Sequence, residues 1–535
     1  MTDKPTFRGP LIRLTTLAGL MIAVTGCPSS DDRAPDAKSA AVDQKTEIPP
    51  GPPDGPEVES DVEPDVPQEP AKFTLVITGR LDGYMEPCGC AGLDKMKGGM
   101  GRRHSLFMKL RQEKAWPVIG IDVGGTAKGY GRQAEIKFHR MADGMKQMGY
   151  DAIGLGMTDL RLNTLELVSD VAKPSAFLSA NVTLFGDETL TDKMRIVEAA
   201  GVKIGITSVL GNQAQRAINN PDVSVIDAVA ALEKVVPELK NQADFLILLA
   251  HANMKETAEL AEKFPDFDLI VTAAGGDVPP GEAAVIGASK SLLIEVGQKG
   301  MHAIVLDILD TDSPRPVPHR YHRVPLDAQL ADSPDMKMLM GVYQEELERL
   351  GFRELGIPTG NRAPPHPQKE TLGKFVGSKE CMDCHEVSYD IWKKTGHAKA
   401  FDTLVELDPP RQFDPECVSC HVIGWHPTKY FPYEGGYESL DGDEAKGLAK
   451  TPHLIDVGCE SCHGPGGAHV AAEMGSDEAL QREMQKASVV TKEEVQDHAS
   501  DKYCRSCHDL DNSPEFDFET YWPKVEHYED KELSD

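Results

Sequence analysis

Apolar residues in the middle of the chain form short runs, and these runs are separated by stretches in which apolar positions recur with a helical period. Runs typical of buried strands occupy Phe73–Thr78, Pro117–Val123 and Ala152–Leu155. Arg102–Lys114 and Ala134–Met148 lie between them and carry the helical period. Strands that alternate with helices predict an α/β domain of layered sheets with flanking helices.

The alternation continues through what we take as one domain, residues 72–330. Further strands are expected at Ala176–Val182, Phe245–His251 and Asp268–Thr272. Ala284–Gly297 and His302–Leu309 follow each other closely, which favours antiparallel pairing between them.

The pattern changes after this domain. Residues 331–371 contain a helix with mixed charges, Asp335–Leu350, and then a linker with several prolines. Residues 372–535 show little regular apolar periodicity and many Gly, Pro and His residues. We therefore expect a multidomain protein, whose last domain is mainly helical and irregular.

The first 71 residues differ from both domains. Residues 1–27 have a basic start, an apolar run from Leu14 to Val24 and the ending Thr25-Gly26-Cys27, which together predict a secretory signal. The ending resembles a bacterial lipobox, in which Cys27 becomes the lipidated first residue, although a plain signal peptide is the alternative. The apolar run is too short for an ordinary transmembrane helix. Residues 28–71 are rich in Pro, Asp and Glu, so we expect a disordered tether.

The lipidated residue would attach the exported protein, on the periplasmic side, to the inner or outer membrane. The chain has 86 acidic and 56 basic residues, a formal charge of -30. This charge argues against nucleic acid as a partner. It favours a redox partner protein with a basic docking face, although simple solubility explains it equally well.

The sequence Cys-x-x-Cys-His occurs four times in the last third of the chain, and it is the attachment signature of c-type haem. The two thiols bind the haem covalently and the His becomes the proximal iron ligand. Zinc sites would not require a His at a fixed offset. The copies are Cys381, Cys384 and His385; Cys417, Cys420 and His421; Cys459, Cys462 and His463; and Cys504, Cys507 and His508.

The copies predict four haem c groups, with porphyrins forming much of the core of residues 372–535. Low-spin iron needs a second axial ligand as well. The candidates for that distal position are more numerous than the haems: His397, His426, His453, His469, His498 and His527.

This region resembles the tetrahaem cytochrome c-554 family. The resemblance rests on Trp392–His397 after the first motif, Val457–Gly466 around the third with His469, and Trp522–His527 near the end. It implies an electron carrier in which His397, His469 and His527 are distal ligands. The family commonly leaves one haem five-coordinate; His426 and His453 leave that open for this chain.

Residues 72–330 resemble the metallophosphoesterase domain of the 5'-nucleotidase family. Matching segments are Gly98–Arg103, Ile121–Gly125, Met148–Gly156, Ser179–Val182 and Leu248–His251. The resemblance implies a metallophosphoesterase-like layered sandwich, whose family members hold two metals at strand ends.

Most of those metal ligands are replaced in this chain. Gly79-Arg80-Leu81 stands at the family's Asp-x-His and Gly125 at its second Asp. Met157-Thr158-Asp159 stands at its Asn-His-Glu, and Ala274-Gly275-Gly276 at its His-x-His. His251 alone stands where a ligand would, and we expect it to be a hydrogen-bonded residue instead. Phosphoesterase activity is therefore not expected.

Cys88 and Cys90 follow the first strand of this domain, where the family begins its metal site. A Cys-x-Cys pair can hold one further metal or react as a redox thiol. It can also close a tight disulfide in an oxidising compartment. The sequence does not separate a functional thiol site from a structural turn.

These observations predict an exported, lipid-anchored carrier of electrons through four haems, with the nucleotidase-like domain serving for docking or sensing. One alternative is an oxidoreductase of a small nitrogen or sulfur species at a five-coordinate haem. A reaction at Cys88 and Cys90, a phosphoesterase with replaced ligands and a structural scaffold are others.

Overall fold

The structure, a computed structural model, describes residues 71–87, 96–439, 449–496, 502–509 and 511–527. All of these belong to one compact unit of the chain, residues 62–535. The signal sequence with Cys27, most of the expected tether, Cys88, Cys90 and His498 lie outside the described residues.

A six-stranded sheet forms around the first predicted strand, in the order β14-β13-β1-β2-β3-β4. Strands β1 to β4 are parallel, β13 pairs antiparallel with β1, and β14 pairs antiparallel with β13. The bounds are β1 Phe73–Thr78, β2 Val118–Asp122, β3 Tyr150–Gly154, β4 Phe177–Leu178, β13 His302–Ile308 and β14 His319–Pro325.

A second six-stranded sheet has the order β11-β12-β10-β9-β7-β6. Its four central strands are parallel, and each edge is closed by an antiparallel hairpin partner. The bounds are β6 Met194–Ala199, β7 Val202–Leu210, β9 Phe245–His251, β10 Leu269–Thr272, β11 Ala284–Ile286 and β12 Ser291–Glu295. A small separate pair joins β5 Val182–Leu184 to β8 Val223–Val225.

The two sheets share one apolar core. Phe73 of β1 and Phe245 of β9 meet edge to face, with ring centroids 5.5 Å apart. Helices α1 Met100–Met108, α2 Arg132–Met148, α3 Thr164–Val171 and α7 Pro334–Glu354 pack on the other face of the first sheet. Helices α5 Ala228–Gln242 and α6 Met254–Lys263 cover the second, and α4 is the short Asn212–Gln215. The predicted α/β layered sandwich is therefore confirmed.

One predicted pairing is wrong. Ala284–Gly297 does not pair with His302–Leu309; it folds on itself as the β11-β12 hairpin. The chain then crosses to the other sheet, where β13 pairs with β1 and β14. The short connection therefore joins sheets that are stacked face to face, which apolar periodicity alone does not distinguish from a hairpin. The β6-β7 hairpin was not predicted.

Helix α7 leads from this domain into a mainly helical region of short elements, as predicted. They are α8 Lys369–Leu372, α9 Glu386–Lys393, α10 Ala400–Glu406, α11 Pro415–Val418, α12 Cys459–His463, α13 Gly467–Glu473, α14 Glu478–Ser488, α15 Lys492–Gln496, α16 Cys504–Cys507 and α17 Phe518–Tyr521, with the two-residue strands β15 Trp425–His426 and β16 Phe431–Pro432. The described residues include no helix with both the length and the apolar character needed to cross a bilayer.

Candidate functional site

The four Cys-x-x-Cys-His motifs lie in or beside short helical turns. Cys381 ends the 3-10 turn Ser378–Cys381, and the other three motifs begin within α11, α12 and α16. Residues three apart in a helical turn point to the same side, so the two thiols of a motif can reach one ligand.

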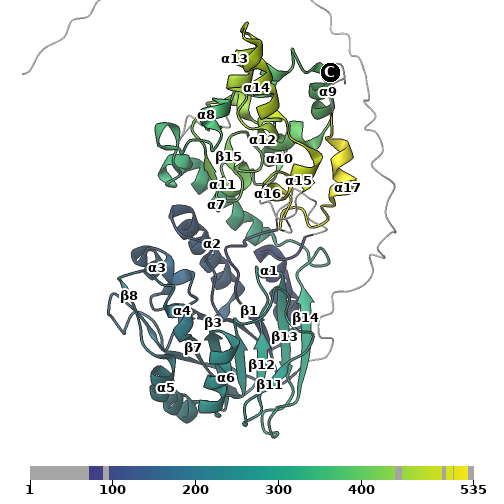
Figure 1. The fold of residues 1–535 in the computed structure, drawn as a ribbon. Helices are drawn as coiled ribbons and strands as arrows, with labels where there is room; N and C mark the ends of the chain where they lie inside the picture. The colour runs from purple at the N-terminus through teal and green to yellow at the C-terminus, as the bar shows by residue number, and fades with distance from the viewer. Residues whose placement is uncertain (1–70, 88–95, 440–448, 497–501, 510, 528–535) are drawn as a thin grey trace, which may run out of the picture. The chain divides into compact units, whose positions relative to one another are not determined.

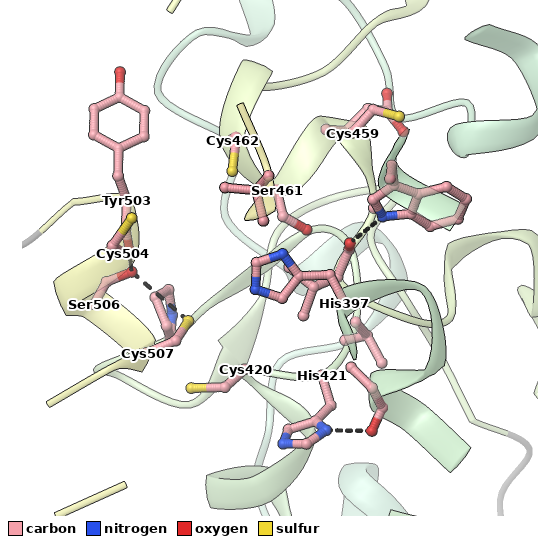
Figure 2. A pocket seen from close by; sticks show the side chains of 18 of the residues that line it. His397, Cys420, His421, Cys459, Ser461, Cys462, Tyr503, Cys504, Ser506 and Cys507 are labelled. Atoms are coloured by element: carbon pink, nitrogen blue, oxygen red, sulfur yellow. Dashed lines mark hydrogen bonds between the residues drawn. The ribbon is translucent and has the colours of Figure 1, made fainter. Parts of the chain in front are cut away.

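All four motifs line a single cavity of about 2370 Å³. Pockets for one drug-sized ligand are commonly about 300–1,000 Å³, so this cavity is large enough for several large groups. Figure 2 shows its interior, where Cys420, Cys459, Cys462, Cys504 and Cys507 lie around the rings of His397 and His421.

The three distal candidates chosen from the sequence each face a proximal His. The ring centroids are 6.0 Å apart for His385 and His469, 6.1 Å for His508 and His397, and 5.9 Å for His463 and His527. Two imidazoles on opposite sides of one metal, with metal–nitrogen bonds of about 2 Å as known for zinc, have ring centroids about 6 Å apart. The spacing therefore fits bis-histidine ligation of three irons.

Backbone carbonyls orient several of these rings. Nδ1 of His463 lies 2.8 Å from the carbonyl oxygen of Ser488, Nδ1 of His421 lies 2.5 Å from that of Ala400, and Nδ1 of His527 lies 2.9 Å from that of Val525. Donation from Nδ1 leaves Nε2 unprotonated, which is the usual arrangement of a metal-ligating His.

Burial also keeps these rings in the form that binds iron. It lowers the pKa of His385, His397, His421 and His463, and it lowers the pKa of His508 to about 4. A neutral imidazole has a lone pair for the metal, whereas an imidazolium does not.

The second axial ligand of an iron at His421 is not assigned by these ring pairs. His426 lies beside Phe431 and Tyr433, with centroids 5.3 and 6.1 Å away, and His498 is outside the described residues. His453 lies within electrostatic range of Glu460 near the third motif. The choice among these residues stays a prediction.

The wall of the cavity fits porphyrins as well as their iron. Val387, Met474 and Val489 line it although their side chains are 65%, 84% and 63% exposed, so they present apolar surface that a large flat ring would cover. The sulfur atoms of Cys381 and Cys459 lie close enough to interact directly, and so do those of Cys420 and Cys507. The first and third attachment points are therefore neighbours, as are the second and fourth.

Glu460, an intervening residue of the third motif, clamps that motif to the segment before the first. Its carboxylate is buried and accepts N–H bonds from Val376 at 3.0 Å, Gly377 at 2.7 Å and Gly466 at 2.6 Å. Ser378 Oγ accepts from the backbone N–H of Cys459 at 3.1 Å. Sequence reasoning missed this clamp, because an exposed-looking Glu inside a motif carries no local signal of burial.

At the strand ends of the α/β domain, Arg80 links two of the positions where the family has metal ligands. Its guanidinium donates to the carbonyl oxygens of Gly275 at 2.5 Å and Gly276 at 3.2 Å. The family's first and last ligand positions are thus joined by a positively charged side chain of the protein itself.

Asp159 performs a similar role for the neighbouring loops. It is fully buried and accepts backbone N–H bonds from Gly125 at 3.0 Å, Ala127 at 2.8 Å and Gly156 at 2.8 Å. Burial raises the pKa of Asp159 to about 6. His251 Nδ1 lies 3.3 Å from the carbonyl oxygen of Val123, as expected of a hydrogen-bonded residue. Among the described residues, no group of three or more His, Cys, Asp or Glu side chains is placed to hold a metal ion.

Comparison with known proteins bears on both domains. Residues 380–464 match the family model described as cytochrome c554 and c-prime. Cytochrome c-554 of Nitrosomonas europaea is 32% identical over 148 residues, which are 25% of this chain and 57% of that protein. Protein 5NUC of Lutzomyia longipalpis is 25% identical over 187 residues, 33% of this chain and 32% of that protein. The chain thus spans about half of one relative and a third of the other.

Solved structures are similar to parts of this chain. The sulfate thiohydrolase SoxB of Thermus thermophilus is 15% identical with a TM-score of 0.44, covering 53% of this chain and 62% of that one. A 5'-nucleotidase precursor of the same organism is 16% identical with a TM-score of 0.45, covering 61% and 67%.

Both resemblances expected from the sequence are confirmed: the C-terminal region is cytochrome c554-like, and the domain before it resembles 5'-nucleotidases. The cytochrome match implies covalently bound haem c with its iron, and it supports a multihaem cytochrome c role in electron transfer.

Proposed function

We propose that this protein is an exported electron carrier that binds four haem c groups in one cavity and is anchored to a membrane by lipid on Cys27. The observation that supports this most strongly is the set of three His pairs at about 6 Å inside a cavity lined by all four attachment motifs. In this proposal each Cys pair attaches a haem, and the haem supplies the redox change.

The residues of the chain fix how the haems are held. His385, His421, His463 and His508 would hold iron through Nε2, and His397, His469 and His527 would each supply a second imidazole to one of three irons. The neighbouring sulfur atoms place the first attachment site beside the third and the second beside the fourth, and Cys462 of the third lies within electrostatic range of Cys504 of the fourth. An electron could therefore pass through the whole set. The -30 charge steers a partner with a basic docking face.

The haem number is tested by mass spectrometry and haem absorbance of the purified full-length protein. We expect four covalent haems, and three in the double variant Cys459→Ala, Cys462→Ala. The matched control Cys88→Ala, Cys90→Ala alters a Cys pair outside the motifs and is expected to retain four. Fewer than four haems in the unaltered protein would contradict the proposal.

Electron paramagnetic resonance separates a carrier from a haem enzyme. Bis-histidine irons give low-spin ferric signals, which we expect for the haems at His385, His463 and His508. A ferric high-spin signal that shifts with nitric oxide or cyanide, together with turnover of a small nitrogen or sulfur species, would contradict the carrier function. These two results would indicate a haem reductase or oxidase instead.

A further inference from the structure

The α/β domain contributes part of the wall of the haem cavity. Lys137 of α2 and Tyr343 and Gln344 of α7 line the cavity together with the segment 83–87. On the cytochrome side, this part of the wall is formed by Asp414, Glu416 and the second attachment motif. The contact therefore concerns the haem attached at Cys417 and Cys420 in particular.

Lys137 places a buried positive charge at this contact. Its side chain is 10% exposed, and its Nζ lies 3.0 Å from a carboxylate oxygen of Glu416, the residue directly before Cys417. The Tyr343 ring centroid lies 5.7 Å from the same Nζ. Burial alone would lower the pKa of Lys137, but Glu416 and Asp414 raise it above its ordinary value, so the ammonium is charged at neutral pH. The Cys417 sulfur is within electrostatic range of it.

Asp414 fixes the short helix that carries the second motif. It is the N-cap of α11, and its Oδ1 accepts the backbone N–H of Glu416 at 3.0 Å. Two side chains from helices that pack on the first sheet donate to the same carboxylate: Gln133 Nε2 of α2 at 2.8 Å and Gln344 Nε2 of α7 at 3.2 Å. The α/β domain thus holds both acidic residues that precede Cys417.

We propose that Lys137 is a positioning residue of the haem at Cys417 and Cys420, acting through Glu416 to orient that attachment site and to set the reduction potential of that haem. This inference rests on the proposed attachment of haem at the second motif. It gives the nucleotidase-like domain a role within the cavity, in addition to any docking role.

The sign of the effect follows from electrostatics. Reduction adds one negative charge to the haem, so a nearby ammonium favours the reduced form and a nearby carboxylate favours the oxidised form. In a buried site both effects are stronger than in water, because the dielectric response is weaker. Among the described residues, the other charged and titratable groups around the second motif include Lys128, Asp414, Tyr343, Tyr430 and Asp509. The Glu86–Arg411 ion pair lies beside Asp414.

The test is a redox titration of the full-length holoprotein and its variants, followed by visible spectra at pH 8. Lys137→Gln is expected to lower the potential of one haem, and Glu416→Gln is expected to raise the potential of the same haem. Each single variant is expected to shift the reduction potential by about 59 mV. For a one-electron couple this corresponds to a tenfold change in the ratio of reduced to oxidised haem. The double variant should return close to the unaltered protein, as should Lys137→Arg.

The matched control is Lys337→Gln, which removes an exposed ion pair between α7 and Asp408. We expect no haem potential to change in this control. If Lys137→Gln and Glu416→Gln shift the potential in the same direction, or leave all potentials unchanged, the inference is wrong. If the unaltered protein carries no haem at Cys417 and Cys420, the proposed function itself is contradicted. The haem count therefore distinguishes failure of the proposed function from failure of this inference.

Discussion

Single side chains determine how the strand ends of the α/β domain are held. Arg80 and Asp159 bond to backbone groups there, and His251 is held neutral beside them. Burial, together with the charge of Arg80, lowers the pKa of His251 to about 4 despite its bond to the carbonyl of Val123. A His that must stay neutral makes the folded domain sensitive to acid.

His251 therefore predicts an acid-dependent loss of stability. Its folded pKa lies below the unfolded value of about 6.5. Its contribution is fully present above pH 6.5 and is lost as the pH falls from 6.5 to 4, by at most about 3 kcal/mol. In His251→Asn this part of the pH dependence should vanish. Urea unfolding at pH 7, 6, 5 and 4.5 measures how the free energy of unfolding of the α/β domain depends on pH. If this dependence is the same in His251→Asn as in the unaltered protein, His251 is not the group responsible.

His139 predicts the opposite dependence. It lies between Asp170 and Glu166, and these carboxylates raise its pKa, with the Asp170 hydrogen bond the largest cause. A raised folded pKa gives stability that is present below pH 6.5 and is lost as the pH rises through the folded value. His139→Asn should thus be destabilised most at pH 5 and least at pH 9 in the same unfolding experiment.

At the scale of elements, buried carboxylates connect short helices that have little apolar packing. Glu460 joins α12 to the segment before the first motif, and Asp414 caps α11 while side chains of α2 and α7 hold it. Each bond satisfies a backbone or side-chain donor that burial would otherwise leave unpaired.

Removing the Glu460 carboxylate should destabilise the haem region. Glu460→Ala leaves the N–H groups of Val376, Gly377 and Gly466 without this acceptor, at about 1–3 kcal/mol for each that water cannot reach. We expect a lower melting temperature of the holoprotein with all haems still attached, and a smaller loss in Glu460→Gln. The exposed Glu478→Ala on α14 should change stability by less than about 0.5 kcal/mol. Equal effects of the two alanine variants would exclude the clamp.

At the scale of the whole molecule, apolar burial is distributed unevenly. The large cores lie within and between the two sheets and their helices. The main apolar cluster of the described haem region is small and includes Phe352 of α7. We therefore expect a region with so little side-chain core to depend on its proposed haems for stability.

This distribution predicts how the protein behaves when haem attachment is blocked. Full-length protein produced without haem attachment should be cut by protease within residues 372–535, while the α/β domain resists cleavage. Limited proteolysis with mass spectrometry of the fragments measures this, with the holoprotein as control. Equal resistance of both regions would show that side chains alone stabilise the haem region.

Much of this could be predicted from the sequence, because the information was local. Strand and helix alternation and the four motifs depend on spacing along the chain. His397, His469 and His527 are distal candidates through the resemblance to the cytochrome c-554 family, and each of their rings faces a proximal His. The pairing of β13, the burial of Glu460 and the contact of Lys137 with Glu416 could not be predicted. Each depends on segments that are far apart in sequence. Lys137, a charged residue of the amphipathic helix α2, looks exposed until α11 is placed beside it.

The hydrogen bonds from Gln133 and Gln344 to Asp414 have a consequence for the order in which the protein folds and receives its haems. These donors belong to helices of the domain with the large core, which needs no haem to complete it. That domain can therefore fold first and present a finished surface to the second motif while its thiols are still free. Haem attachment would then begin with one of the four Cys pairs already held in place, whereas the other three pairs belong to a region with little apolar core of its own.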